Sequence, residues 1–198
     1  MANISSYTFE QYCERVTEFH GHLAPGMLVG GYMVDLALRN LPKDILFDVV
    51  CETPACLPDA IQLLTPCSVG NQWLKVIDVG RYAAAFYNKY TGDGVRVYID
   101  IDKLERWPAI KEWYLKLKPK KQQDRQQIFD QIKEAGSQIC GLETIKVDPE
   151  FFIRPDKTVA VCPVCHESYR SEDGEICPAC KEGRLPYKVV AKTTSRGG

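Results

Sequence analysis

The stretch AAAFYNKYTGDGVRVYIDI, residues 83–101, decides the fold class of this 198-residue chain. Two runs rich in aromatic and β-branched residues, 83–90 and 95–101, flank the four residues Thr91-Gly92-Asp93-Gly94. Asp-Gly between two such runs is typical of a β-hairpin. We therefore expect two antiparallel strands joined by a tight turn here.

Further strands and helices are predicted on both sides of the hairpin. Apolar, partly β-branched runs predict strands at 45–51, 73–79 and 144–147. Apolar residues at helical spacing predict helices within 8–18, 27–41, 55–64 and 103–135, the last interrupted near Lys118-Pro119. Thr8 and Gln11 have the spacing of a capping box at the start of the first helix. The sequence thus predicts an α+β fold with a mixed or antiparallel sheet and flanking helices.

Composition and charge narrow the class of protein. Apolar residues make up 45% and charged residues 26% of the chain, and the formal net charge is −1, so no overall basic field favours nucleic acid. We interpret the basic run 116–121 as a solvated loop. The chain has no apolar run of membrane-spanning length, and its start lacks the basic and apolar regions of a secretory signal. We expect a cytoplasmic protein with no membrane partner.

The segment CPVCHESYRSEDGEICPAC, residues 162–180, predicts a small metal-binding module. Two Cys-x-x-Cys pairs supply four thiolates, the closed shell of a structural Zn²⁺ site: Cys162, Cys165, Cys177 and Cys180. The two alternatives are a redox dithiol, which normally opens a helix in a βαβ unit, and replacement of one cysteine by His166. Proline-containing turns at 148–149 and 154–155 suggest a core domain over 1–155 and a four-cysteine zinc ribbon or finger over 156–198.

A second candidate site lies near the N-terminus, in FHGHLAPG, residues 19–26. His20 and His22 flank one glycine, and Cys56 and Cys67 follow later in the chain. Imidazole and thiolate groups together suit Zn²⁺ or a similar transition metal. The alternative is that the histidines are hydrogen-bonded structural residues and the cysteines small core residues. The isolated cysteines Cys13, Cys51 and Cys140 are expected in the core.

Several ordered motifs resemble the family of the E subunit of formylmethanofuran dehydrogenase. They are FHGHLAPG, then ETPAC at 52–56 with DAIQ at 59–62, TPCSVGN at 65–71, and the FYN strand at 86–88 with its Thr91-Gly92 turn. The resemblance covers most of residues 15–100, and the four-cysteine module fits the longer members. It implies an α+β core, a C-terminal zinc finger and a homodimer.

The resemblance also implies a metal site in the core. Carried over by position, its ligands are His20, His22, Cys56 and Cys67, and the expected ion is a second transition metal such as Zn²⁺. This chain departs from the family at Ala24, where the family motif has cysteine. Alanine can neither bind metal nor act as a thiol, so any activity that requires that sulfur is absent here.

Three functions stay open at this point. The first is a metal-binding accessory subunit of an oxidoreductase complex, because the chain has no ferredoxin-like cysteine run of its own. The second is a stand-alone metal-dependent enzyme, with Asp59 or Glu52 as general base. The third is a binding module that uses Lys181, Arg184 and Lys188, although the acidic residues among them make a nucleic-acid partner unexpected.

Overall fold

The computed structural model describes residues 3–152, 158–183 and 185–187. The chain divides into two compact units, Met1–Phe152 and Ile153–Gly198. The first contains a five-stranded sheet and its helices, and the second contains a two-stranded sheet with a short helix. In the part of the chain described, none of the helices is both long enough and apolar enough to cross a membrane.

The sheet of the first unit is mixed, with strand order β2-β1-β3-β4-β5. Its strands are β1 (Phe47–Cys51), β2 (Leu74–Val76), β3 (Ala83–Asn88), β4 (Asp93–Ile99) and β5 (Cys140–Lys146). The β1–β2 pair is parallel, the β1–β3, β3–β4 and β4–β5 pairs are antiparallel, and the β3–β4 pair is the hairpin that the sequence predicts. The predicted α+β class with a mixed sheet is confirmed.

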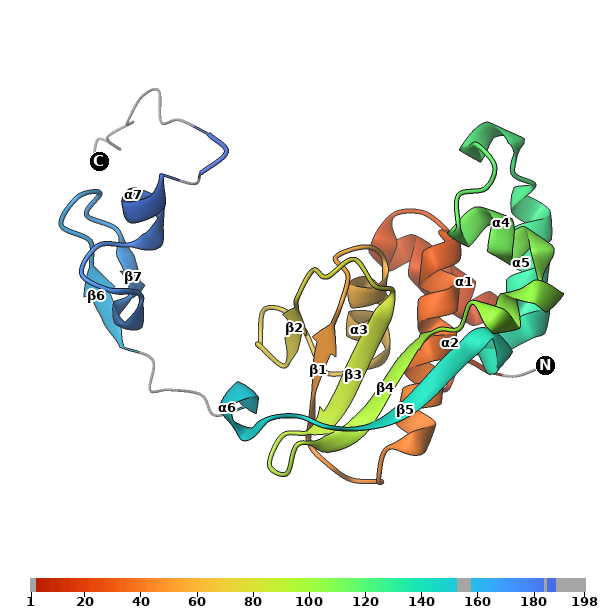
Figure 1. The fold of residues 1–198 in the computed structure, drawn as a ribbon, viewed down its shortest axis with the longest axis horizontal. Helices are drawn as coiled ribbons and strands as arrows, with labels where there is room; N and C mark the ends of the chain where they lie inside the picture. The colour runs from red at the N-terminus through yellow and green to blue at the C-terminus, as the bar shows by residue number, and fades with distance from the viewer. Residues whose placement is uncertain (1–2, 153–157, 184, 188–198) are drawn as a thin grey trace, which may run out of the picture. The chain divides into compact units, whose positions relative to one another are not determined.

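Helices of this unit lie beside the sheet (Figure 1). They are α1 (Phe9–His20), α2 (Pro25–Asn40), α3 (Leu57–Leu64), α4 (Pro108–Tyr114), α5 (Arg125–Ala135) and α6 (Pro149–Phe152), with 3₁₀ turns η1 (Asp102–Arg106), η2 (Lys120–Gln122) and η3 (Gly136–Ile139). The capping box of α1 is present: Gln11 N donates to Thr8 Oγ1, and Thr8 N donates to Gln11 Oε1.

The core lies between the sheet and α2. In β4 the side chains of Val95, Val97 and Ile99 are buried, because alternate residues of a strand face the same side. Helix α2 is buried on most of its surface, which explains its small and apolar sequence, PGMLVGGYMVDLALRN. Both α2 and α3 begin near one end of this core, and their N-termini position the candidate site.

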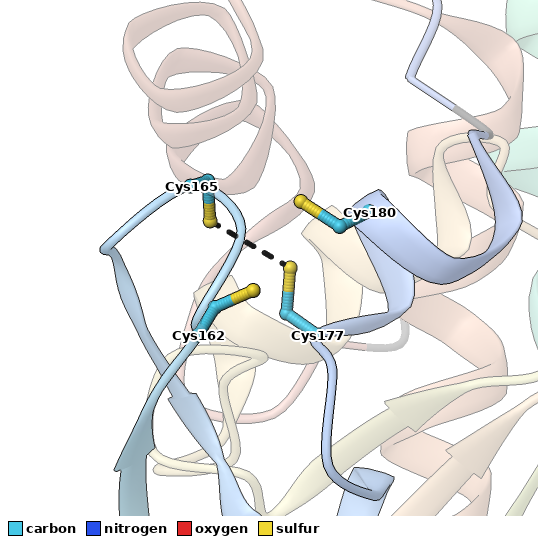
Figure 2. Close-up of side chains that lie close together, drawn as sticks. All are labelled: Cys162, Cys165, Cys177 and Cys180. Atoms are coloured by element: carbon cyan, nitrogen blue, oxygen red, sulfur yellow. Dashed lines mark hydrogen bonds between the residues drawn. The ribbon is translucent and has the colours of Figure 1, made fainter.

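The second unit is built on a short antiparallel pair, β6 (Val159–Val161) and β7 (Ser168–Arg170). A 3₁₀ turn, η4 (Ser171–Asp173), and Gly174 follow, and helix α7 (Pro178–Glu182) comes last. The first cysteine pair lies in the β6–β7 connection, and the second lies at the start of α7 (Figure 2).

Candidate metal centres and the core cavity

Four cysteine side chains converge in the second unit (Figure 2). The sulfur atoms of Cys162, Cys165, Cys177 and Cys180 all lie within 4.8 Å of one another. A Zn²⁺ ion with bonds of about 2.3 Å to tetrahedral sulfurs would hold those sulfurs about 3.8 Å apart. The observed Cys165 Sγ to Cys177 Sγ distance is 3.9 Å, so the four thiols fit a closed zinc shell.

The electrostatics of this cluster favour a bound cation. Backbone N–H groups, first that of Cys165, lower the pKa of the Cys162 thiol to about 6. The pKa of the Cys180 thiol changes in the opposite direction: its hydrogen bond with Cys177 raises that pKa to about 12. Thiolates packed this closely repel one another, and a divalent ion between them removes that repulsion.

The two alternatives for the tail do not match this geometry. A redox dithiol normally opens a helix in a βαβ unit, whereas the first pair here lies in a β-turn and the unit contains no parallel strand pair in its described residues. His166 has an exposed side chain and a φ of 62°, and it is not part of the cluster.

In the first unit, His20 is held from both sides of its ring. It is the last residue of α1, and Gly21 ends that helix with a φ of 83°, a conformation that glycine adopts without strain. His20 Nδ1 lies 2.7 Å from Asp59 Oδ2 on α3. The other ring nitrogen, Nε2, lies 3.9 Å from the sulfur of Cys56. The His22 ring is 4.9 Å from the His20 ring, measured between centroids.

Cys56 occupies an unusual backbone position. It precedes α3 with φ 51° and ψ −45°, a region that residues with a side chain rarely adopt. Its sulfur lies so close to α2 that a Cβ added at Gly26 would come within 2.9 Å of it. Burial, followed by the charge of Asp59, raises the pKa of the Cys56 thiol. The protein therefore holds this thiol beside His20 at a cost in backbone strain.

A cavity of about 650 Å³ opens beside these groups. His22, Ala24 and Cys56 are among the residues that line it, together with the N-terminal residues of α2. Ala24 therefore faces the cavity and contributes no sulfur to it. Outside the four-cysteine cluster, no group of three or more histidine, cysteine or carboxylate side chains in the described residues has ligand atoms as close together.

Cys67 is not brought to the histidines. It follows the C-terminus of α3, whereas Cys56 precedes the N-terminus, and eight helical residues span about 12 Å. Its sulfur instead lies 3.5 Å from the carbonyl oxygen of Phe47, and burial raises its pKa to about 11. The geometry thus agrees with the alternative for Cys67, a small core residue. Cys51 and Cys140 are buried and Cys13 is half-buried.

Of the two candidate bases, only Asp59 belongs to this site. Glu52 is buried and engaged by arginines: Arg96 donates to both its oxygens, at 2.6 and 3.0 Å, and Arg81 Nε lies 2.7 Å away. The hydrogen bond from Arg96 lowers the pKa of Glu52. Glu52 is therefore held in a structural ion pair with Arg96 and Arg81.

Sequence reasoning misses the basic and aromatic wall of the cavity. Lys116, Lys118 and Lys120 line it, although the sequence of their run favours a solvated loop, and Arg125 and Trp113 complete the wall. The run connects α4 to α5, and α5 returns to the start of α2, where Arg125 Nη2 donates to Leu23 O at 2.6 Å. That contact joins residues 102 positions apart, and no local pattern predicts it.

Known proteins match both units. A family model described as "FmdE, Molybdenum formylmethanofuran dehydrogenase operon" matches residues 19–147. A second, described as "FmdE treble clef zinc finger", matches residues 154–188. A crystal structure of a tungsten formylmethanofuran dehydrogenase FmdE-like protein from Syntrophus aciditrophicus is 47% identical, with a TM-score of 0.86, and the match covers 95% of this chain and 100% of that chain.

A curated relative from Archaeoglobus fulgidus is described as a probable S-adenosyl-L-methionine-binding protein. It is 32% identical over 103 residues, which is 47% of this chain. The match spans only 28% of the relative's own length. From the match over residues 19–147, the chain belongs to the FmdE family, and its second unit is a four-cysteine treble-clef zinc finger.

Proposed function

We propose that this chain is a cytoplasmic metal-binding protein that holds a structural Zn²⁺ in its finger and a second transition metal beside the core cavity. The finger ligands are the four clustered cysteines. The core ligands are His20, His22 and Cys56, and Cys67 is left out because α3 separates it from them. The expected second ion is also Zn²⁺, which suits this set of imidazole and thiolate groups.

The observation that carries the proposal is the arrangement around His20. Its Nδ1 is occupied by Asp59 and its Nε2 faces Cys56. Histidines that bind metal usually have their second nitrogen held by a carboxylate in this way, which fixes the ring and makes the free nitrogen a better ligand. A metal bound here would supply Lewis-acid chemistry at the wall of the cavity.

For its biological role we propose an accessory subunit of an oxidoreductase complex, acting as a homodimer. Support comes from the family and from the Syntrophus relative, which is described as a tungsten formylmethanofuran dehydrogenase FmdE-like protein. The second candidate is a stand-alone metal-dependent enzyme. It is favoured by the cavity beside His22 and Cys56, which has room for a small substrate.

Elemental analysis of purified variants tests both metal sites. The wild type should hold about two equivalents of metal, and Cys162→Ser/Cys177→Ser and His20→Ala should each hold about one. His166→Ala, which changes an exposed histidine outside both sites, should keep both. Wild-type metal content in a folded His20→Ala protein would refute the core site. Light scattering on the same samples tests the homodimer, which should have twice the mass of one chain.

A further inference from the structure

The core cavity has a positively charged wall. Lys116, Lys118, Lys120 and Arg125 line it, and none of its lining residues in the described chain is an aspartate or glutamate. Cavities lined by one sign of charge concentrate ligands of the opposite sign. Four cations around a concave surface of about 650 Å³ therefore indicate an anionic ligand.

Most of this charge is not neutralised by the protein. Lys118 is paired with Glu112 at 2.7 Å. The Arg125 guanidinium contacts a carbonyl oxygen and the ring of Phe129, neither of which carries charge. Lys116 and Lys120 have no ion pair or side-chain hydrogen bond within the described part of the chain. At least three cations are therefore available to a ligand.

The start of α2 adds a second, independent attraction for anions. Ala24, Pro25 and Gly26 line the cavity, and the 16-residue helix has no side-chain cap at Ala24. Gly26 and Met27 are buried, yet their amides donate to no backbone or side-chain acceptor in the residues that the structure describes. Buried N–H groups are rarely left unpaired, and those at a helix N-terminus bind anions readily.

The rest of the wall is apolar, with Trp113, Leu23, Pro119 and Ile128. A small inorganic ion would leave this surface and most of the volume unused. Pockets of this size commonly bind whole metabolites, with the apolar wall packed against the ligand body and a few charged groups fixing its orientation. An aromatic ring such as that of Trp113 also suits a planar ring in the ligand.

We propose that the cavity binds an organic anion of about nucleotide size, with its phosphate or carboxylate groups on Lys116, Lys120 and Arg125 and its body against Trp113. This names the ligand class of the cavity described above. It rests on the proposed function only in placing that ligand beside His20 and Cys56. The charged wall lies on other residues, so anion binding does not require the core metal.

Titration calorimetry on the full chain tests the proposal, with ADP, citrate and uncharged adenosine as probes at about 50 mM salt. At least one of the two anions should bind, and if ADP binds, uncharged adenosine should bind more weakly. If only ADP binds, the recognised group is a phosphate, and if only citrate binds, it is a carboxylate. Lys116→Gln/Lys120→Gln should weaken the affinity for the anion that binds about 10-fold or more, because the variant loses two charge-assisted contacts.

Lys121→Gln is the matched control. It removes the same charge from the same loop, but Lys121 is exposed and does not line the cavity, so affinity should be unchanged. The proposal is overturned if neither anion binds at low salt, or if the double variant binds as tightly as the control. His20→Ala separates this proposal from the metal site: it should lose the core metal and keep anion binding.

Discussion

His20 Nδ1 and Asp59 Oδ2 lie 2.7 Å apart and join the end of α1 to the first turn of α3. An ionised carboxylate can only accept a hydrogen bond, so a neutral His20 carries its proton on Nδ1. The lone pair then lies on Nε2, the nitrogen that faces Cys56. One hydrogen bond thus fixes which nitrogen of the ring is free for a metal or for a proton from the thiol.

This contact predicts the effect of Asp59→Asn. The amide keeps the size of the side chain but loses its charge and can present an N–H group to the ring. Metal affinity of the core should fall about 10- to 100-fold, as for other carboxylates that hold a metal-binding histidine. Competition of the folded variant with a chromophoric chelator measures this. Glu14→Gln, an exposed carboxylate of α1, is the control, and equal affinities in the two variants would show that Asp59 does not orient His20.

The strained backbone at Cys56 predicts an unusual order of stability. Cys56→Gly and Cys56→Ala both remove the thiol, but only glycine adopts φ 51° without a steric cost. We expect the glycine variant to be more stable by about 1 kcal/mol, the reverse of the usual helix preference. Urea denaturation of the two variants measures the difference. An alanine variant of equal or greater stability would mean that the strain is absent.

The ion pair of Glu52 with Arg96 predicts a loss of stability in acid. Arg96 holds the pKa of Glu52 below its ordinary value of 4.5, so the folded chain binds this proton less readily than the unfolded chain. The stabilisation from this ion pair is complete above pH 4.5 and is lost as the pH falls through the lower pKa of Glu52 in the folded chain.

Glu52→Gln should therefore cost about 2 kcal/mol at pH 7, less than a fully buried pair, because Arg96 keeps its contact with Glu143. The difference from the wild type should shrink in acid below pH 4.5. Chemical denaturation across this range gives both values. Glu143→Gln, the more exposed partner of Arg96, should cost under about 1 kcal/mol at every pH. A pH-independent difference for Glu52→Gln would contradict the assignment.

The close approach of α2 to Cys56 predicts that Gly26→Ala is destabilising. A Cβ there would lie 2.9 Å from the Cys56 sulfur and 3.2 Å from the hydroxyl of Tyr82. Overpacking of this kind costs about 1–3 kcal/mol. Gly70→Ala is the control, because its nearest neighbour is 3.9 Å away. In thermal denaturation the Gly26→Ala variant should have the lower midpoint temperature. Equal midpoints would show that the start of α2 can shift to accommodate the added methyl group.

Local patterns predict the parts of the molecule that depend on local chemistry. The Asp-Gly hairpin, the capping box of α1 and the two Cys-x-x-Cys pairs each need only a few adjacent residues, and the structure contains all three. The site in the core is harder to predict, because it depends on the path of the chain. Spacing suggests Cys56 and Cys67 alike, but the helix between them leaves only the first beside His20.

The partners of charged residues are the second feature that the sequence does not predict. The sequence alone marks Glu52 as a carboxylate that could act as a base. Its partner Arg96 lies on β4, two strands across the sheet, and the strand register is needed to place the two residues together. The sequence of the basic run at 116–121 is typical of a solvated loop. Its place beside the cavity depends on α5, which contacts the start of α2. In both cases the decisive partner lies more than 40 residues away in the sequence, beyond the reach of a motif.

Helix α3 also protects the core site from the protein's own oxidation. A disulfide requires Cα atoms within about 7 Å of each other, whereas the eight residues of α3, a helix about 12 Å long, lie between Cys56 and Cys67. We therefore expect these two thiols not to cross-link while α3 is folded. An oxidant that reaches the cavity would then convert Cys56 into a sulfenic acid or a mixed disulfide with a small external thiol, and a reductant can reverse both.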